Sequence, residues 1–220
     1  MLTDAFNFSA SDRAFIEQMD VRFPHLISAF NEAAAIPAKQ RYKWARKRLE
    51  NLLRAGYTRH GIPDDKAETV REHIDASKAL AAYWAPKGMD LNLILFMIEI
   101  HDIGEAIIGD FTPKDDITRE EKMRLERLAV ELIFEKMDPC LKEIWLSFED
   151  KTCAEALVAH DIEKAQCLFK ALEYEIKDKA LEGTFDDFWD NLETRWSSDI
   201  GPKMHKHTKN ARDRLRATPR

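Results

Sequence analysis

The ten residues from Leu91 to Ile100, LNLILFMIEI, constrain the fold of this chain more than any other segment. Because they are apolar on nearly every side of a helix, they are predicted to form the buried central helix of a domain, with Asp90 as its N-cap. The 220 residues include only 7 Gly and 8 Pro, whereas Ala, Leu, Glu, Lys and Arg are plentiful. This composition favours helix almost everywhere. The sequence therefore predicts an all-α helical bundle.

Caps, and apolar residues spaced three and four apart, predict the other helices. Thr118 with Glu121 forms a capping box, and Thr152 with Glu155 repeats the pattern. Gly56 is expected to end the third helix. The predicted helices cover about residues 9–20, 23–35, 38–55, 66–84, 91–100, 118–136, 141–148, 152–179, 185–195 and 202–216.

The charges and the apolar runs narrow the possible functions. The chain carries 40 acidic and 34 basic residues, a net charge of -6 that is too negative for a general nucleic-acid binder. Its longest apolar runs fall far short of the roughly 20 residues that cross a bilayer, and its first residues lack a signal-peptide pattern. We therefore expect a soluble, cytoplasmic protein. The basic tail beyond His205 is expected to be frayed.

Cysteine usage agrees with a reducing compartment. The chain has three cysteines, Cys140, Cys153 and Cys167, and they show neither CxxC nor zinc-finger spacing. An odd number without such spacing indicates reduced thiols rather than a structural disulfide.

A polar run follows the apolar central helix. His101, Asp102 and Glu105 lie where a buried charge or imidazole without a partner would cost several kcal/mol, and a metal ion is the simplest candidate partner. With His73 and Asp161 from two other predicted helices, the run supplies the imidazoles and carboxylates that a divalent ion binds. Glu105 follows His101 by one helical turn, so it can orient or deprotonate a water beside such an ion.

Several polar residues also have an ordinary structural interpretation, which stays open at this point. Arg54 ends a basic helix and can simply face the helix dipole. Asp110 can be a turn residue after a glycine. Glu72 can be a surface helical charge. His160 points about 100° away from Asp161 around a helix and is expected to be packed or exposed rather than a ligand.

Four segments of the chain resemble the HD-domain phosphohydrolases, and specifically the branch of 5′-deoxynucleotidases. The segments are RAGYTRHGIP, ETVREHIDAS, IEIHDIGEAIIGDFTP and EALVAHDIEKAQCLFKALEYE. Together they span about residues 50–180. The resemblance implies an HD-type helical bundle over residues 46–200, preceded by an N-terminal helical extension (1–45) and followed by a basic C-terminal helix or tail (201–220).

The resemblance also implies a metal centre. One divalent ion, whether Mn²⁺, Co²⁺, Mg²⁺, Fe²⁺ or Zn²⁺, would be held by residues that match the Glu-His, His-Asp and Asp-x-x-Lys motifs of the family. The implied ligands are His73, His101, Asp102 and Asp161. By the same resemblance, Glu105 would position a water or accept its proton, and Asp110 would support that water or a sugar hydroxyl.

The implied reaction is hydrolysis of the 5′-phosphomonoester of a (deoxy)nucleoside monophosphate, giving nucleoside and phosphate. Arg54 and Arg59 would hold phosphate oxygens through charge-assisted hydrogen bonds. Tyr57 stands near the position where the family has a tryptophan, and Lys164 completes the Asp-x-x-Lys pattern, so both are expected at the substrate. A homodimer is implied as well, whereas the preferred base and metal are not.

Two other functions remain possible, and a third, an oxygenase, is disfavoured by the sequence. The same metal core serves phosphohydrolases of nucleoside triphosphates or cyclic phosphodiesters, although few cations lie near the motifs, which favours a monophosphate. Two-iron oxygenases of this fold need extra histidines, and residues 103–159 contain none. A noncatalytic nucleotide-binding module is the other possibility; such proteins usually lose a ligand, and here all are present.

Overall fold

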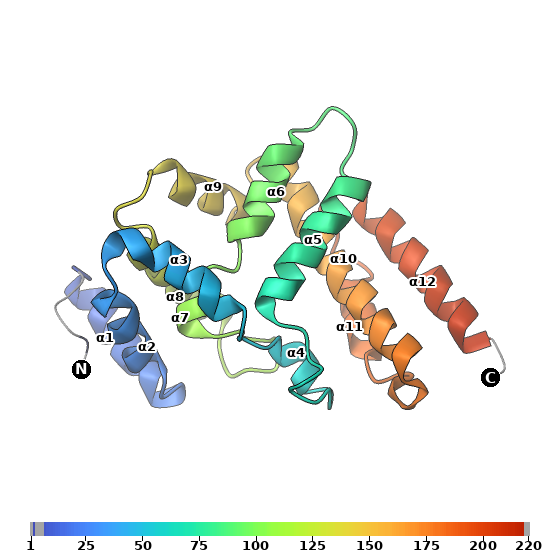
Figure 1. Ribbon diagram of the computed structural model, residues 1–220, viewed down its shortest axis with the longest axis horizontal. Helices are drawn as coiled ribbons and strands as arrows, with labels where there is room; N and C mark the ends of the chain where they lie inside the picture. Colours follow the sequence, from blue (N-terminus) through green and yellow to red (C-terminus); the bar gives the residue numbers. More distant parts are fainter. Residues whose placement is uncertain (1, 3–6, 218–220) are drawn as a thin grey trace. The chain divides into compact units, whose positions relative to one another are not determined.

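The computed structural model describes residues 2 and 7–217 (Figure 1). Residues 1, 3–6 and 218–220, at the ends of the predicted N-terminal extension and C-terminal tail, lie outside the described residues. The helices are α1 (Ala10–Arg22), α2 (Leu26–Ala35), α3 (Ala38–Leu49), α4 (Ala55–Thr58), α5 (Val70–Trp84), α6 (Leu91–Ile100), α7 (Glu105–Ile108), α8 (Arg119–Ile133), α9 (Cys140–Glu149), α10 (Ala154–Lys177), the 3₁₀ turn η1 (Lys179–Leu181), α11 (Asp186–Leu192) and α12 (Gly201–Ala217). The described residues contain no β-strand, so the prediction of an all-α fold is confirmed.

The first of two compact units consists of the residues up to Arg71 together with His101–Trp145. In this unit α2 and α3 both pack against α7 and α8, and α1 packs against α2. The apolar faces of these helices form its core. Fully buried members of that core include Phe30, Leu49, Leu125, Val130 and Ile133.

A buried arginine fastens α2 and α3 to α8. The side chain of Arg41 donates hydrogen bonds to the carbonyl oxygens of Ala33 (3.1 Å), Ile36 (2.9 Å) and Leu132 (3.2 Å), and it forms an ion pair with Glu135. A buried guanidinium is tolerated only when its N–H groups are satisfied in this way. The N-terminal helices are therefore an integral part of the first unit.

The second unit consists of Glu72–Ile100 and the residues from Leu146 onward. Its central element is α10, which contacts α6, α11 and α12 (Figure 1). The apolar helix predicted at residues 91–100 is α6, and its buried positions face this contact. Those positions include Ile94, Met97, Ile98 and Ile100.

Several predicted helix boundaries are wrong, and α5, for example, begins at Val70 rather than near residue 66. The helix that begins at residue 38 ends at Leu49 rather than at Gly56, because residues 52–54 are extended: the Val70 N–H donates to the Leu52 carbonyl, and Leu53 and Thr69 form an isolated bridge. The capping box at Thr118 is confirmed. The second box is absent, since Cys153 is the N-cap of α10 and makes no side-chain bond there.

The expected fraying beyond His205 is also wrong, because α12 continues to Ala217. Arg212, in the middle of α12, is 5% exposed. Its guanidinium donates to both carboxylate oxygens of Glu175 on α10, with Nε 2.8 Å from Oε2, and lies 4.6 Å from the ring centroid of Trp189. The basic residue Arg212 is therefore buried and fastens α12 to α10.

Two further features concern the thiols and the hydropathy of the helices. All three cysteines are free thiols, as predicted. Among the described residues, every helix is too short or too polar to cross a membrane.

Arg212→Met is expected to lower the free energy of unfolding by about 3 kcal/mol, because it leaves the buried Glu175 carboxylate without its main cation. Urea unfolding at neutral pH would measure the loss. Arg214→Met, at an exposed position of the same helix, is the matched control and should change stability by less than about 0.5 kcal/mol. Equal losses in the two variants would contradict a structural clamp at Arg212.

Candidate active site

An arginine and two aspartates meet in the first unit, at the residues the sequence singled out. Arg54 Nη1 lies 3.6 Å from Asp102 Oδ2 and 3.5 Å from Asp110 Oδ1. All three side chains are mostly buried, with exposed fractions of 16%, 16% and 8%. At these distances the guanidinium offsets the two negative charges without forming tight hydrogen bonds to them.

Asp110 also fixes the backbone that carries Arg54. Its Oδ2 accepts a hydrogen bond of 2.7 Å from the N–H of Ala55, the first residue of α4. Gly109 precedes it with φ +85°, a conformation that favours glycine, and this turn ends α7. Asp110 is thus a positioning residue for Arg54 and not only a turn residue.

Glu105 lies in the middle of this group of charges. It is 3% exposed, and its Oε2 accepts no hydrogen bond among the described residues. Burial raises the pKa of Glu105 well above its ordinary value, the negative charges of Asp102 and Asp110 raise it further, and the cations Lys122 and Arg54 oppose the rise. A carboxyl group with a raised pKa can hold or accept a proton near neutral pH.

Lys122, on α8, supplies the second cation near Glu105. Its Nζ lies 3.9 Å from Glu105 Oε1 and 3.4 Å from Glu126 Oε1, and it donates to the Phe111 carbonyl at 3.3 Å. Burial alone would lower the pKa of Lys122, but the carboxylates of Glu126 and Glu105 raise it above its ordinary value. Lys122 therefore remains charged and limits the repulsion among the acids.

His101 and Asp102 lie in the turn between α6 and α7. His101 Nε2 is 3.0 Å from Asp102 Oδ2, and the indole N–H of Trp145 donates to the His101 carbonyl at 3.0 Å. The side chain of His101 is 5% exposed. The indole bond fixes the backbone of this turn, so the imidazole and the carboxylate are presented side by side.

In the second unit, His73 on α5 is fully buried. Its Nδ1 lies 2.6 Å from Oε1 of Gln166 on α10. Because an amide oxygen can only accept, Nδ1 carries the proton, and this tautomer presents the lone pair of Nε2 as a metal ligand. Glu163 on α10 offers a carboxylate oxygen within 4.8 Å of a ligand nitrogen of His73.

Asp161 has a different environment. One of its carboxylate oxygens accepts from the N–H of Ser197 (2.8 Å), and the other accepts from the N–H and the hydroxyl of Ser198 (both 2.7 Å). A side-chain Cβ at Gly201 would lie only 2.6 Å from this carboxylate. Asp161 therefore holds the segment that leads into α12.

The geometry of α10 explains why the side chains of Asp161 and Glu163, only two residues apart, have different partners. Residues two apart lie about 200° apart around a helix, whereas residues three apart share a face. Glu163 and Gln166 thus share the face that meets His73, and Asp161 points elsewhere. Asp161 as a metal ligand stays a prediction, and Glu163, which the sequence did not single out, is the α10 carboxylate on the same face as Gln166.

The remaining predicted site residues lie apart from this group of charges or are already engaged. Tyr57 is 1% exposed and belongs to the core of the first unit. Arg59 pairs with Asp115, and Lys164 donates to the Arg195 carbonyl at 3.1 Å. His160 stacks on Phe148, as expected for a packed histidine.

Comparison with known proteins places the chain in a family. The sequence profile of the HD domain matches residues 46–203, and the chain belongs to the HD domain family. It is similar to the 5′-deoxynucleotidase YGK1 of Saccharomyces cerevisiae, at 32% identity over 59% of this chain and 63% of that protein. It is also similar to the 5′-deoxynucleotidase HDDC2 of Dictyostelium discoideum, at 31% identity over 61% of this chain and 76% of that protein.

The solved structures confirm the fold. The PH0347 protein of Pyrococcus horikoshii has 23% sequence identity and a TM-score of 0.62, covering 79% of this chain and 98% of that one. A conserved hypothetical protein of Pyrococcus furiosus gives a TM-score of 0.61 at 21% identity, covering 80% of this chain and 98% of that one. The family profile and the curated relatives, rather than these structures, confirm the predicted membership in the HD-domain, 5′-deoxynucleotidase-like group.

Glu105→Gln is expected to change how stability depends on pH in protein kept metal-free with a chelator. Because folding raises the pKa of Glu105, its stabilising contribution is complete below the unfolded-state pKa of about 4.3 and is lost as pH rises through the folded-state pKa. Glutamine cannot ionise, so the variant avoids this loss, which is about 1.4 kcal/mol for each tenfold difference in proton affinity.

Urea unfolding of both proteins between about pH 4 and pH 9 would measure the difference. The stability of the variant relative to wild type should increase with pH. Glu120→Gln, at an exposed position on α8, should show the wild-type profile. A Glu105→Gln profile parallel to wild type would refute a raised pKa at this position.

Proposed function

We propose that this protein hydrolyses the 5′-phosphomonoester of (deoxy)nucleoside monophosphates, releasing nucleoside and phosphate. The observation that carries the proposal is the buried Glu105 carboxyl, surrounded by Asp102, Asp110 and Arg54, in a chain of the HD domain family. The curated relatives reported above are 5′-deoxynucleotidases. The yeast relative is matched over 63% of its length, so its activity supports this proposal without establishing it.

We propose that His73, His101, Asp102 and one carboxylate from α10 bind a divalent ion. The donor set fits such an ion, because it combines buried imidazoles with carboxylates and fixes the ligand tautomer of His73 through Gln166. A bound divalent ion would lower the pKa of water and offset negative charge on the phosphate. Glu163 is the preferred α10 ligand, since the oxygens of Asp161 already accept three hydrogen bonds; Asp161 is the alternative.

The protein residues then have separate tasks. Glu105 accepts the proton of the attacking water, because its raised pKa makes it a stronger base than an exposed carboxylate. Arg54 binds phosphate oxygens, because it is the guanidinium that lies beside Asp102 and Asp110 and guanidinium groups suit phosphate oxygens. Asp110 holds Arg54 in place. The predicted substrate contacts of Tyr57, Arg59 and Lys164 remain predictions.

Two alternative functions, a triphosphatase and a noncatalytic binding module, can be distinguished from this one by the products they release. A triphosphatase would release polyphosphate, and it would need more cations than the region around Arg54 provides; there Arg59 is already paired with Asp115. A noncatalytic module would bind nucleotide without releasing phosphate.

Two further features are proposed from the sequence and the family. We propose that the protein acts in the cytoplasm and as a homodimer. Light scattering at micromolar concentration tests the dimer directly, and a monomeric mass would reject it.

Phosphate release from deoxynucleoside monophosphates is expected when Mn²⁺, Co²⁺ or Mg²⁺ is added, with much less release from di- and triphosphates. Asp102→Ala should lower kcat/KM by at least about a hundredfold, because it removes a proposed metal ligand. A phosphate assay over a panel of nucleotides would measure both. Polyphosphate as the main product would identify a triphosphatase, and silence with every metal would identify a binding module.

Glu163→Gln is expected to weaken metal binding by about tenfold or more, whereas Asp161→Asn should mainly lower stability. Bound metal can be counted by elemental analysis after equilibrium dialysis, and stability by urea unfolding. Both substitutions remove one negative charge from the same helix, so each controls for the other. Loss of metal in Asp161→Asn with retention in Glu163→Gln would restore Asp161 as the ligand.

A further inference from the structure

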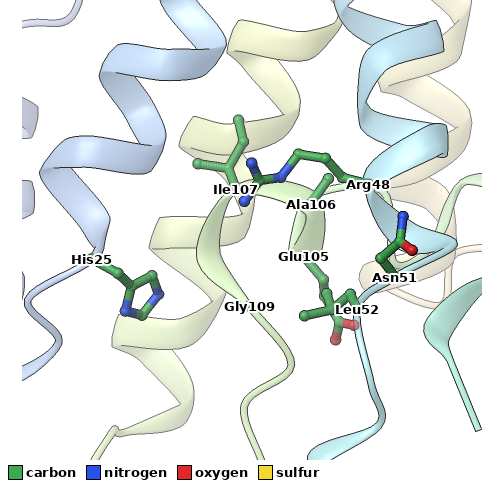
Figure 2. Close-up of a pocket in the computed structure, with 8 residues that line it drawn as sticks. All are labelled: His25, Arg48, Asn51, Leu52, Glu105, Ala106, Ile107 and Gly109. Carbon is green, nitrogen blue, oxygen red and sulfur yellow. The ribbon is translucent and has the colours of Figure 1, made fainter. Parts of the chain in front are cut away.

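A pocket of about 530 Å³ opens beside α7 in the first unit (Figure 2). Its walls come from α7, from the end of α3 and the residues after it, and from His25 just before α2. Pockets of several hundred cubic ångströms hold small organic ligands. None of the roles described so far uses this pocket.

The pocket adjoins the group expected to react. Glu105 and Leu52 both form part of its wall (Figure 2). Residues 52–54 are extended, so Leu52 and Arg54 project to the same side of the backbone. A ligand whose phosphate lies at Arg54 can therefore extend along this side into the pocket.

The walls suit a heterocyclic base better than another phosphate. Leu52, Ala106 and Ile107 supply apolar surface. The only cation that lines the pocket among the described residues is Arg48, whose Nη1 is 2.8 Å from both carboxylate oxygens of Glu32. That pairing offsets its charge, so the pocket does not attract a second anion strongly.

Asn51 is the polar residue that can read a base. It is exposed and lines the pocket at the end of α3. Its side-chain amide offers both a donor and an acceptor, the combination that matches the polar edge of a nucleobase. Opposite wall positions are fixed, since His25 Nε2 is 2.9 Å from the Ile108 carbonyl and Gly109 adds no side chain.

We propose that this pocket binds the nucleoside part of the substrate and that Asn51 hydrogen-bonds the base. The inference rests on the proposed function and deepens it, because it names the residues that select among monophosphates. Arg54 then holds the phosphate, Glu105 lies at the junction, and Leu52, Ala106 and Ile107 pack against the base and the sugar.

The test compares kcat/KM for dAMP, dCMP, dTMP and 2-deoxyribose 5-phosphate, which has no base. In Asn51→Leu, the ratio of kcat/KM for each nucleotide to that for 2-deoxyribose 5-phosphate should fall five- to tenfold. Asn51→Asp keeps the shape and the acceptor but loses the donor. It should therefore favour cytosine and adenine, which present an amino group, over thymine by about tenfold. Asn191→Leu, at an exposed position on α11, is the matched control and should keep the wild-type ratios.

The outcomes separate the two proposals. If wild type hydrolyses monophosphates but both Asn51 variants keep the wild-type ratios, the base site is wrong and the proposed function stands. An equal loss for all substrates, including the one without a base, likewise refutes base recognition. If wild type releases phosphate from none of them under any metal, the proposed function fails and the base site fails with it.

Discussion

The charged centre of the first unit is arranged around one buried carboxyl group, that of Glu105. A charge in that position would repel Asp102 and Asp110, and the protein meets this repulsion from two sides with Arg54 and Lys122. Each cation is anchored independently, one by the turn that Asp110 fixes and the other by the Phe111 carbonyl. The same arrangement that makes the fold tolerate buried acids also holds the proposed proton acceptor, Glu105, whose pKa is raised, so stability and the proposed chemistry share one set of contacts.

The helix α10 shows how one element serves two purposes in the second unit. The face with Glu163 and Gln166 meets His73, while Asp161 fastens the segment before α12 through the N–H groups of two serines. Two acids of similar chemistry are thus separated by helical geometry alone. A motif records only their order along the chain, whereas the direction in which each side chain points decides its role.

The sequence was sufficient for the fold class and for most helices, because hydrophobic periodicity and caps are local signals. The capping box at Thr118 is one such case. Prediction from the sequence failed where contacts between residues far apart in the chain determine where a helix ends. The pairing of residues 52–54 with 68–70 ends α3 early, and the contact of Arg212 with Glu175 keeps α12 helical. For the site, the arginine and acids around Glu105 were predictable from spacing and resemblance. Glu163, the Lys122 counter-charge and the pocket at Asn51 were not, because each depends on contacts between elements.

The contact between Arg212 on α12 and Glu175 on α10 shows that the end of the family match and the end of the folded unit are different positions in the chain. Similarity to the HD domain ends at residue 203, but Arg212 and Arg216, farther along the chain, neutralise Glu175 and Asp186. A chain cut where the recognisable family pattern stops would keep a buried acid and lose the cations that made its burial tolerable. The segment that matches the family profile is therefore shorter than the segment that the fold needs to remain stable.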